Sequence, residues 1–197
     1  MQDVSSQSPT TAAQIIASQL TLAAHNGAKD LERGRLVRFE TPIAGCVPLE
    51  WLRAQNGVTQ YYWSDREGEF DMAGVGEADI LSPDVLERPS PQCLFDTMRA
   101  RLFQKPPSLR YYGGFRFHAG PVKGTRWLAF KEYRFVVPKF EVVRRARGTF
   151  FACNVLVTGD AETDTARFEG TLERMRRLVF PTTPPPMRLP RLLKRED

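Results

Sequence analysis

Between Arg110 and Val157 the chain reads as one strand after another, and this run constrains the fold more than any other part of the sequence. The turns inside it, such as Lys131-Glu132, are far shorter than the dozen or more residues that a crossover between parallel strands needs. The run therefore predicts antiparallel pairing. The expected strands cover 110–118, 125–130, 133–137, 139–145 and 149–157.

Helical patterns stand on both sides of this run. Helices are expected over 11–25, 48–57, from Ser90-Pro91 to Pro106, and 163–179. A strand is expected at 35–41, ended by Pro42, and a hairpin over 59–76. This order predicts an α+β fold, in which helices pack on one face of a largely antiparallel sheet. We expect a disordered lead-in over 1–11, a single α+β domain over 12–180, and a basic linker over 181–197 that holds five prolines.

The net charge of +5 is concentrated at the C-terminal end. From Leu172 to Asp197, seven Lys or Arg residues face three acidic ones, whereas the rest of the chain carries 21 basic and 20 acidic residues. A nucleic-acid-binding protein should show a basic face on its folded body. We therefore expect no nucleic-acid partner.

The N-terminal segment is polar, and no apolar run approaches the roughly 18 residues of a membrane-spanning helix. We expect no membrane association and a cytoplasmic location. The three cysteines, Cys46, Cys93 and Cys153, are odd in number and far apart in sequence, so we expect buried, reduced thiols.

Adjacent glycines interrupt the aromatic stretch "RYYGGFRFH" at Gly113 and Gly114. Glycine weakens a strand, so the pair requires an explanation, such as a bound ligand or a close approach of neighbouring segments. The pair lacks the spacing of a dinucleotide-binding loop. In "AGVGEAD", Gly74 and Gly76 come closer to that spacing, but Asp79 would repel a phosphate. Neither place is expected to bind phosphate.

No side chains form a recognisable catalytic set. The histidines, His25 and His118, have no partner at a metal-ligand spacing, and no nucleophile motif is present. Acidic residues beside turns or on alternating strands are expected to face solvent, namely Glu40, Glu50, Asp65 and Asp71. We assign no catalytic, cofactor-binding or metal-binding residue to this chain.

Aromatic residues cluster on the predicted strands and could form a platform on which nucleic-acid bases stack. Their alternation, with arginines interleaved singly, favours a core between sheet and helices instead. The cluster comprises Tyr61, Tyr62, Trp63, Tyr111, Tyr112, Phe115, Phe117, Trp127 and Phe130.

An ordered set of segments over about residues 35–157 resembles the N-terminal half of the isochorismate synthases. This family belongs to the chorismate-utilising enzymes, together with salicylate and anthranilate synthases. The segments are "FETPIAGCVPLEWLRAQ", "YYWSDREG", "AGVGEADIL", "RYYGGFRF", "RWLAF", "RFVVPKFEVVRR" and "FFACNVLV". The resemblance implies that the Gly-Gly strand is a place of close packing, so that replacing Gly113 or Gly114 should destabilise the fold.

The resemblance also implies the chemistry of a complete enzyme, which converts chorismate to isochorismate. A lysine base, a glutamate acid and a magnesium ion held by glutamates lie in the C-terminal half of that family, in motifs that this chain does not contain. "KFEVVRRARG" matches an N-terminal strand, so Lys139 does not inherit the catalytic role. We expect the chain to be an inactive scaffold that binds no Mg²⁺ by itself and pairs with a missing catalytic half.

Three alternatives stay open at this point. The parent pathway could lead to menaquinone, to a siderophore or to salicylate. The parent could instead be a salicylate or anthranilate synthase. The chain could also be an unrelated α+β domain that recruits a partner through its aromatic surface.

Overall fold

The computed structural model describes residues 7–26, 31, 33–83, 90–102, 108–117 and 131–181. Along the chain the elements are α1 (Pro9–His25), β1 (Arg35–Ile43), α2 (Pro48–Arg53), β2 (Gln60–Ser64), β3 (Asp71–Leu81), α3 (Pro91–Leu102), β4 (Tyr112–Phe115), β5 (Tyr133–Arg145), β6 (Gly148–Val157) and α4 (Ala161–Met175). The expected strand at 125–130 and nearly all of the expected linker at 181–197 lie outside the described residues.

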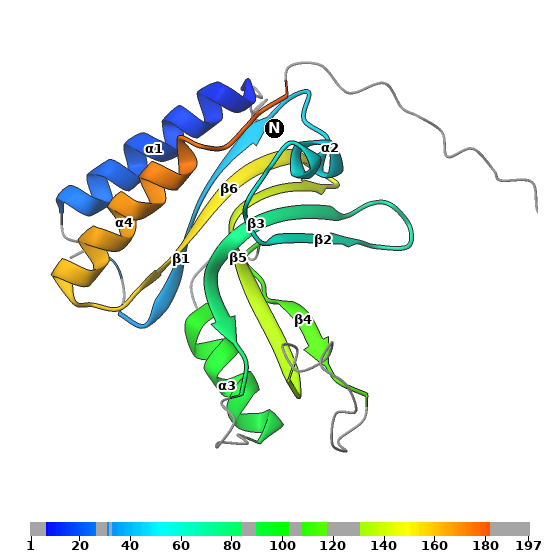
Figure 1. Cartoon of the computed structure of the whole chain (residues 1–197), viewed down its shortest axis with the longest axis vertical. Helices are drawn as coiled ribbons and strands as arrows, with labels where there is room; N and C mark the ends of the chain where they lie inside the picture. Colours follow the sequence, from blue (N-terminus) through cyan, green and yellow to red (C-terminus); the bar gives the residue numbers. More distant parts are fainter. Residues whose placement is uncertain are drawn as a thin grey trace, which may run out of the picture.

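The described residues form one antiparallel sheet of six strands, of which five follow the order β1-β6-β5-β3-β2 and the sixth, β4, pairs with β5 (Figure 1). The long strand β5 is its centre, because β3 pairs with most of its length on one side. On the other side β4 pairs with residues 133–136 of β5, and β6 pairs with residues 140–145. The sheet therefore branches within β5, between these two segments.

One face of the sheet is covered by α1, α2 and α4 (Figure 1). In α1 the buried residues recur every four positions, at Ala12, Ile16, Leu20 and Ala24, which is the stripe of a helix with one apolar face. Ser8 caps this helix, because its side chain accepts a hydrogen bond from the backbone N–H of Thr11. These helices enclose the main core together with aromatic side chains of α2, the strands and the C-terminal segment. The aromatic members of that core are Trp51, Phe140, Phe151, Phe168 and Phe180.

The opposite face of the sheet carries smaller apolar clusters. Leu36 and Val137 pack with Leu109 at 7% exposure or less. Helix α3 reaches this second cluster through Leu102, and its residues Leu94 and Met98 pack with Tyr133. The α+β class and the antiparallel sheet are thus confirmed, with three helices on one face and α3 on the other.

Two strands continue through prolines at which they were expected to end or break. Pro42 lies inside β1, where it is opposite Phe150, and the strand continues to Ile43. This is possible because β1 is an edge strand, where a proline costs no ladder hydrogen bond on the open side. Pro138 lies inside β5, which is one continuous strand rather than two. It falls between the segments paired with β4 and β6, so its missing N–H interrupts neither of those two ladders.

Helix limits also differ at several ends. The first helix begins at Pro9, so the expected disordered lead-in over 1–11 is wrong for residues 9–11, because the Ser8 cap and Pro9 start the helix there. The second helix ends at Arg53 and the last at Met175, each some four residues before the expected end.

Candidate functional site

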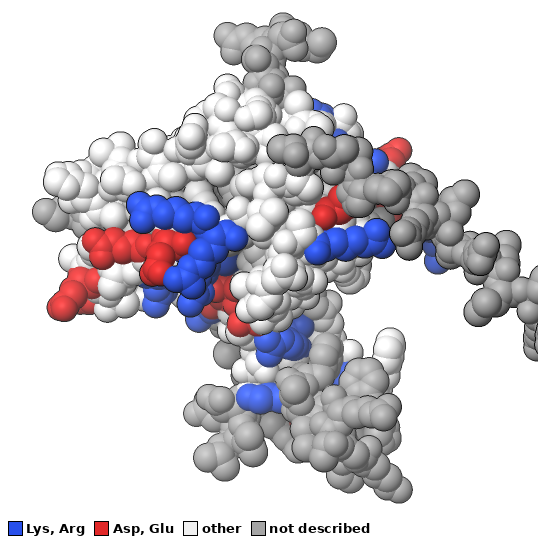
Figure 2. All heavy atoms as spheres, turned by 45° about the horizontal axis from the view of Figure 1, so that its top comes forward, with Lys and Arg blue, Asp and Glu red and all other residues white. Residues whose placement is uncertain are grey.

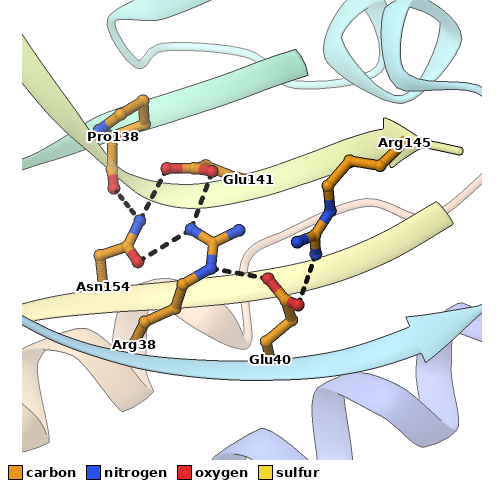
Figure 3. Close-up of polar contacts among 6 residues, drawn as sticks. All are labelled: Arg38, Glu40, Pro138, Glu141, Arg145 and Asn154. Carbon is orange, nitrogen blue, oxygen red and sulfur yellow. Dashed lines mark hydrogen bonds and ion pairs between the residues drawn. The ribbon is translucent and has the colours of Figure 1, made fainter. Parts of the chain in front are cut away.

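Five polar side chains meet on the sheet face opposite α1, α2 and α4, and we call them the arginine–glutamate network. They are Arg38 and Glu40 of β1, Glu141 and Arg145 of β5, and Asn154 of β6 (Figure 3). No helix supplies any of them. The network therefore depends on the register in which the three strands pair.

Arg38 is the centre of the network. Its Nη1 donates to Glu141 Oε2 at 2.9 Å and to Asn154 Oδ1 at 3.1 Å (Figure 3). Asn154 Nδ2 in turn donates to Glu141 Oε1 at 2.8 Å. The side chains of Arg38 and Glu141 are each only 1% exposed. A buried charge pair of this kind is tolerated only when hydrogen bonds satisfy its remaining polar atoms.

Glu40 links the centre of the network to its rim. It accepts a hydrogen bond from Arg38 Nε at 2.7 Å and pairs with Arg145. Burial alone would raise the pKa of Glu40, but the charges and hydrogen bonds of Arg38 and Arg145 outweigh burial and hold that pKa below its usual value. Glu40 is therefore an ionised partner for two arginines and not a proton donor at neutral pH.

A cavity of about 590 Å³ borders the network, and basic side chains dominate its lining. Several buried polar atoms nearby make no hydrogen bond to another described group: Arg38 Nη2, Arg145 Nε, Tyr112 Oη and Ser108 Oγ. Burial raises the pKa of Tyr112, and the charge of Glu141 raises it further. The lining consists of Glu40, Ser108, Arg110, Arg145, Ala146, Arg147 and Phe150.

These residues do not fit a magnesium ion, which prefers free carboxylate oxygens. In the described segments no three histidine, cysteine or acidic side chains converge as metal ligands. The buried carboxylates already have partners: Glu141 pairs with Arg38, Asp71 with Arg144 and Asp79 with Arg101, and Asp164 accepts hydrogen bonds from Thr158 and Gly159.

The two glycines of the Gly-Gly pair differ in the space around them. A Cβ atom on Gly113 would lie 2.0 Å from the carbonyl oxygen of Arg134 and 2.7 Å from Cα of Phe135, in the neighbouring strand β5. The expected close approach is thus present at Gly113. A Cβ on Gly114 would meet no atom within 4 Å, so the same expectation is wrong for Gly114.

Gly74 and Gly76 lie within strand β3 and not in a loop that leads into a helix. A Cβ on Gly74 would lie 2.6 Å from Cβ of Pro138, and Gly76 has a φ of 63° next to a shift in strand register. Asp79 binds Arg101 and Tyr111. Packing between β3 and β5 therefore accounts for both glycines.

Two of the four acidic residues expected in solvent are part of the interior. Glu40 belongs to the network, and Asp71 is 5% exposed and paired with Arg144. Asp71 has Arg144 on its paired strand β5, whereas Glu40 has Arg38 on its own strand and Arg145 on β5. These cations replace the water that a buried carboxylate loses. Asp65 accepts a hydrogen bond from the N–H of Phe70 across the β2–β3 turn, and Glu50 is half-buried.

The structure describes one of the two histidines and all three cysteines. His25 ends α1, and His118 lies outside the described residues. Cys153 is buried, as expected, and burial raises the pKa of its thiol. Cys46 is half-buried, and Cys93 is exposed on α3, so the expectation of buried thiols is wrong for Cys93.

The aromatic cluster is only in part a core between sheet and helix, because Tyr111 packs against both small clusters that α3 reaches while other members are exposed. Trp63 is 53% exposed and Tyr62 44%, because both belong to the edge strand β2, which no helix covers. Phe115 and Phe117 are also exposed. Trp127 and Phe130 lie outside the described residues, and the large core aromatics come from other positions.

Sequence reasoning did not identify Arg38, Glu141 and Asn154. In "RLVRFET", Arg38 and Glu40 stand two residues apart, as do any polar residues on the solvent side of a strand. Only the neighbouring strands distinguish a buried, paired arginine from a solvent-facing one. The residues that Arg38 contacts on those strands, Glu141 and Asn154, are 103 and 116 residues away in sequence.

Basic and acidic side chains are mixed on one face of the described residues. Figure 2 shows basic side chains beside acidic ones in small groups on the visible side of the molecule. Within the described residues, no helix has both the length and the apolar character to span a bilayer.

Part of a solved isochorismate synthase has the same fold. The structure of MenF, the menaquinone-specific isochorismate synthase from Escherichia coli, matches with a TM-score of 0.51 and 18% sequence identity. The match covers 86% of this chain and 35% of that protein. It shows a shared α+β fold over nearly the whole chain.

Sequence comparison leads to the same group. Residues 20–193 match the family model described as "Chorismate binding enzyme", so the chain belongs to the chorismate-binding enzyme family. The isochorismate synthase MenF of Bacillus subtilis (strain 168) is 24% identical over 173 residues, which cover 78% of this chain and 36% of that protein. The chain thus spans about a third of the length of the relatives it matches, and the expected resemblance to this enzyme group is confirmed.

Proposed function

We propose that this chain is the N-terminal scaffold portion of an isochorismate synthase, the enzyme that interconverts chorismate and isochorismate. The observation that carries the proposal is the family match over residues 20–193, together with two isochorismate synthases among the matched proteins. In this proposal the sheet and its three covering helices support catalytic groups that lie outside the 197 residues.

The arginine–glutamate network supports a scaffold role. Its carboxylates pair with Arg38 and Arg145, so they are poorly suited to hold a metal. The network instead favours one alignment of the strands, because its hydrogen bonds form only when β1, β5 and β6 are in the observed register. The proposed role of Mg²⁺, binding and neutralising a substrate carboxylate, belongs to residues of the complete enzyme beyond this chain.

The test is an assay of purified chain 1–197 with chorismate and Mg²⁺, with isochorismate separated by chromatography. We expect no product above a control without protein. The full-length isochorismate synthase MenF of Bacillus subtilis is the positive control. Turnover by the chain alone would contradict the scaffold proposal.

A second assay separates an isochorismate synthase from its sister enzymes. The chain is co-expressed with the portion of the Bacillus subtilis enzyme that it does not match, and the product is identified. Isochorismate is expected only when both parts are present, and complementation that fails with this portion but succeeds with the corresponding portion of a salicylate or anthranilate synthase would reassign the chain to a sister branch.

A further inference from the structure

A second cavity, of about 480 Å³, opens on the side of the sheet that carries α4. Its floor is the pairing of β3 with β5 at Val75 and Phe140, and one wall is the end of α4 with the segment that follows. The other wall is the loop between α2 and β2. The lining residues are Gln55, Asn56, Gly57, Val58, Thr59, Val75, Gly76, Glu77, Lys139, Phe140, Arg174, Arg177 and Leu178.

An irregularity of the sheet directs Lys139 into this cavity. Consecutive residues of a regular strand point to opposite faces, yet Lys139 and Phe140 both line the cavity. Gly76 stands across from Lys139, where a Cβ on the glycine would lie 3.5 Å from Cβ of the lysine. Its φ of 63° is open to glycine and strained for other residues, so this local geometry requires Gly76.

The positive charges around the cavity are not balanced by described partners. In the part of the chain that the structure describes, the side chains of Lys139 and Arg174 take part in no ion pair, whereas Arg177 pairs with Glu173. The one carboxylate of the lining, Glu77, already binds Tyr61 and Arg134. Burial lowers the pKa of Lys139, and the charge of Arg174 lowers it further.

We infer that this cavity binds a small organic anion, with Lys139 as its central contact and Arg174 at its rim. A carboxylate or phosphate group of the ligand would take the place between the two cations and relieve their repulsion. Val58, which is exposed, and Leu178, which is half-buried, form an apolar surface beside them, which suits a ligand with a non-polar body. The site lies on the other side of the sheet from the arginine–glutamate network and does not depend on the proposed function.

The test is an NMR titration of the ¹⁵N-labelled full chain with benzoate and, in a parallel arm, inorganic phosphate, each against chloride at matched ionic strength. We expect saturable shifts of the amide signals of Gly57, Gly76 and Arg174 in the benzoate arm. Saturation by phosphate as well would show that the anionic group suffices, and saturation by benzoate alone would show that the apolar surface contributes. The absence of saturable shifts in both arms would overturn the inference.

Substitutions then test the cations themselves. Lys139→Met keeps the length of the side chain and removes its charge, and we expect about tenfold weaker benzoate binding. Arg99→Gln is the matched control, because Arg99 is 70% exposed on α3 and lies outside the cavity. If Lys139→Met does not fold, the exposed Arg174→Gln replaces it, with an expected weakening of about threefold. Binding that equals that of the Arg99→Gln control would refute the site.

Discussion

Asn154 Nδ2 donates a hydrogen bond to the carbonyl oxygen of Pro138 at 2.8 Å, at the place where the sheet branches (Figure 3). Strand β6 pairs with β5 only from Phe140 onward, so no backbone N–H of β6 is paired with this carbonyl. The same amide group also holds Glu141 and accepts from Arg38. One buried side chain thus joins the branch point to the charged network.

Asn154→Ala removes three hydrogen bonds from a fully buried position. We expect a loss of roughly 2–4 kcal/mol in the free energy of unfolding, because buried polar groups would be left without partners. Urea unfolding followed by circular dichroism measures it. Gln19→Ala, at an exposed position of α1, is the control, and a loss no larger than that of the control would contradict the assignment.

Glu141→Leu leaves the buried Arg38 with Glu40 as its remaining carboxylate. We expect a loss of about 3–5 kcal/mol, as is typical when one partner of a buried ion pair is removed. Adding Arg38→Met should recover part of that loss, since the unpaired charge is then gone. A double-mutant cycle by urea unfolding tests this.

The matched control is the exposed pair of Glu173, on α4, and Arg177, just after the end of that helix. Glu173→Leu should change stability by less than about 1 kcal/mol. Equal losses for Glu141→Leu and Glu173→Leu would show that the network contributes little more than a surface pair.

Gly113→Ala and Gly114→Ala should differ although the residues are adjacent. The first places a Cβ against the backbone of β5 and should cost at least about 2–3 kcal/mol. The second places a Cβ in open space and should stay within about 0.5 kcal/mol. Thermal melting measures both, and equal melting temperatures for the two variants would disprove the close approach at Gly113.

Asp164 connects the start of α4 to the end of β6. Its carboxylate accepts hydrogen bonds at 2.8 Å from the N–H and the hydroxyl of Thr158 and from the N–H of Gly159. Burial alone would raise the pKa of Asp164, but these hydrogen bonds outweigh burial and lower it. The ionised form therefore stabilises the folded state, fully so above the unfolded pKa of about 4.

This stabilisation is lost as the pH falls through the lowered pKa of the folded state. We expect Asp164→Asn to cost about 1–3 kcal/mol at pH 7, and the difference from the unmodified chain to shrink below about pH 4. Unfolding measured from pH 3 to pH 7 gives this profile. Glu162→Gln, on an exposed residue of the same helical turn, should show no comparable pH dependence, and a flat profile for Asp164→Asn would count against the hydrogen-bonded carboxylate.

Local patterns in the sequence were enough to predict many of the elements. The hairpin over 59–76 follows from its aromatic strand and the turn that ends in Gly68, which has a φ of 74°. The start of α3 follows from Ser90-Pro91, since Ser90 caps the helix at the N–H of Cys93. Alternation and turn chemistry are properties of neighbouring residues, so they can be read without knowledge of the fold.

Long-range pairing could not be predicted from those patterns. Whether Trp63 is core or surface depends on β2 being an edge strand, and whether Pro138 breaks a strand depends on the gap between β4 and β6. Arg38 looks like a solvated strand residue until Glu141 and Asn154 reach it from more than a hundred residues away. The amino-acid sequence by itself determined most of the helices and strands and the family. Burial, charge pairing and both cavities were decided by strand register, because only the folded sheet brings distant side chains within bonding distance.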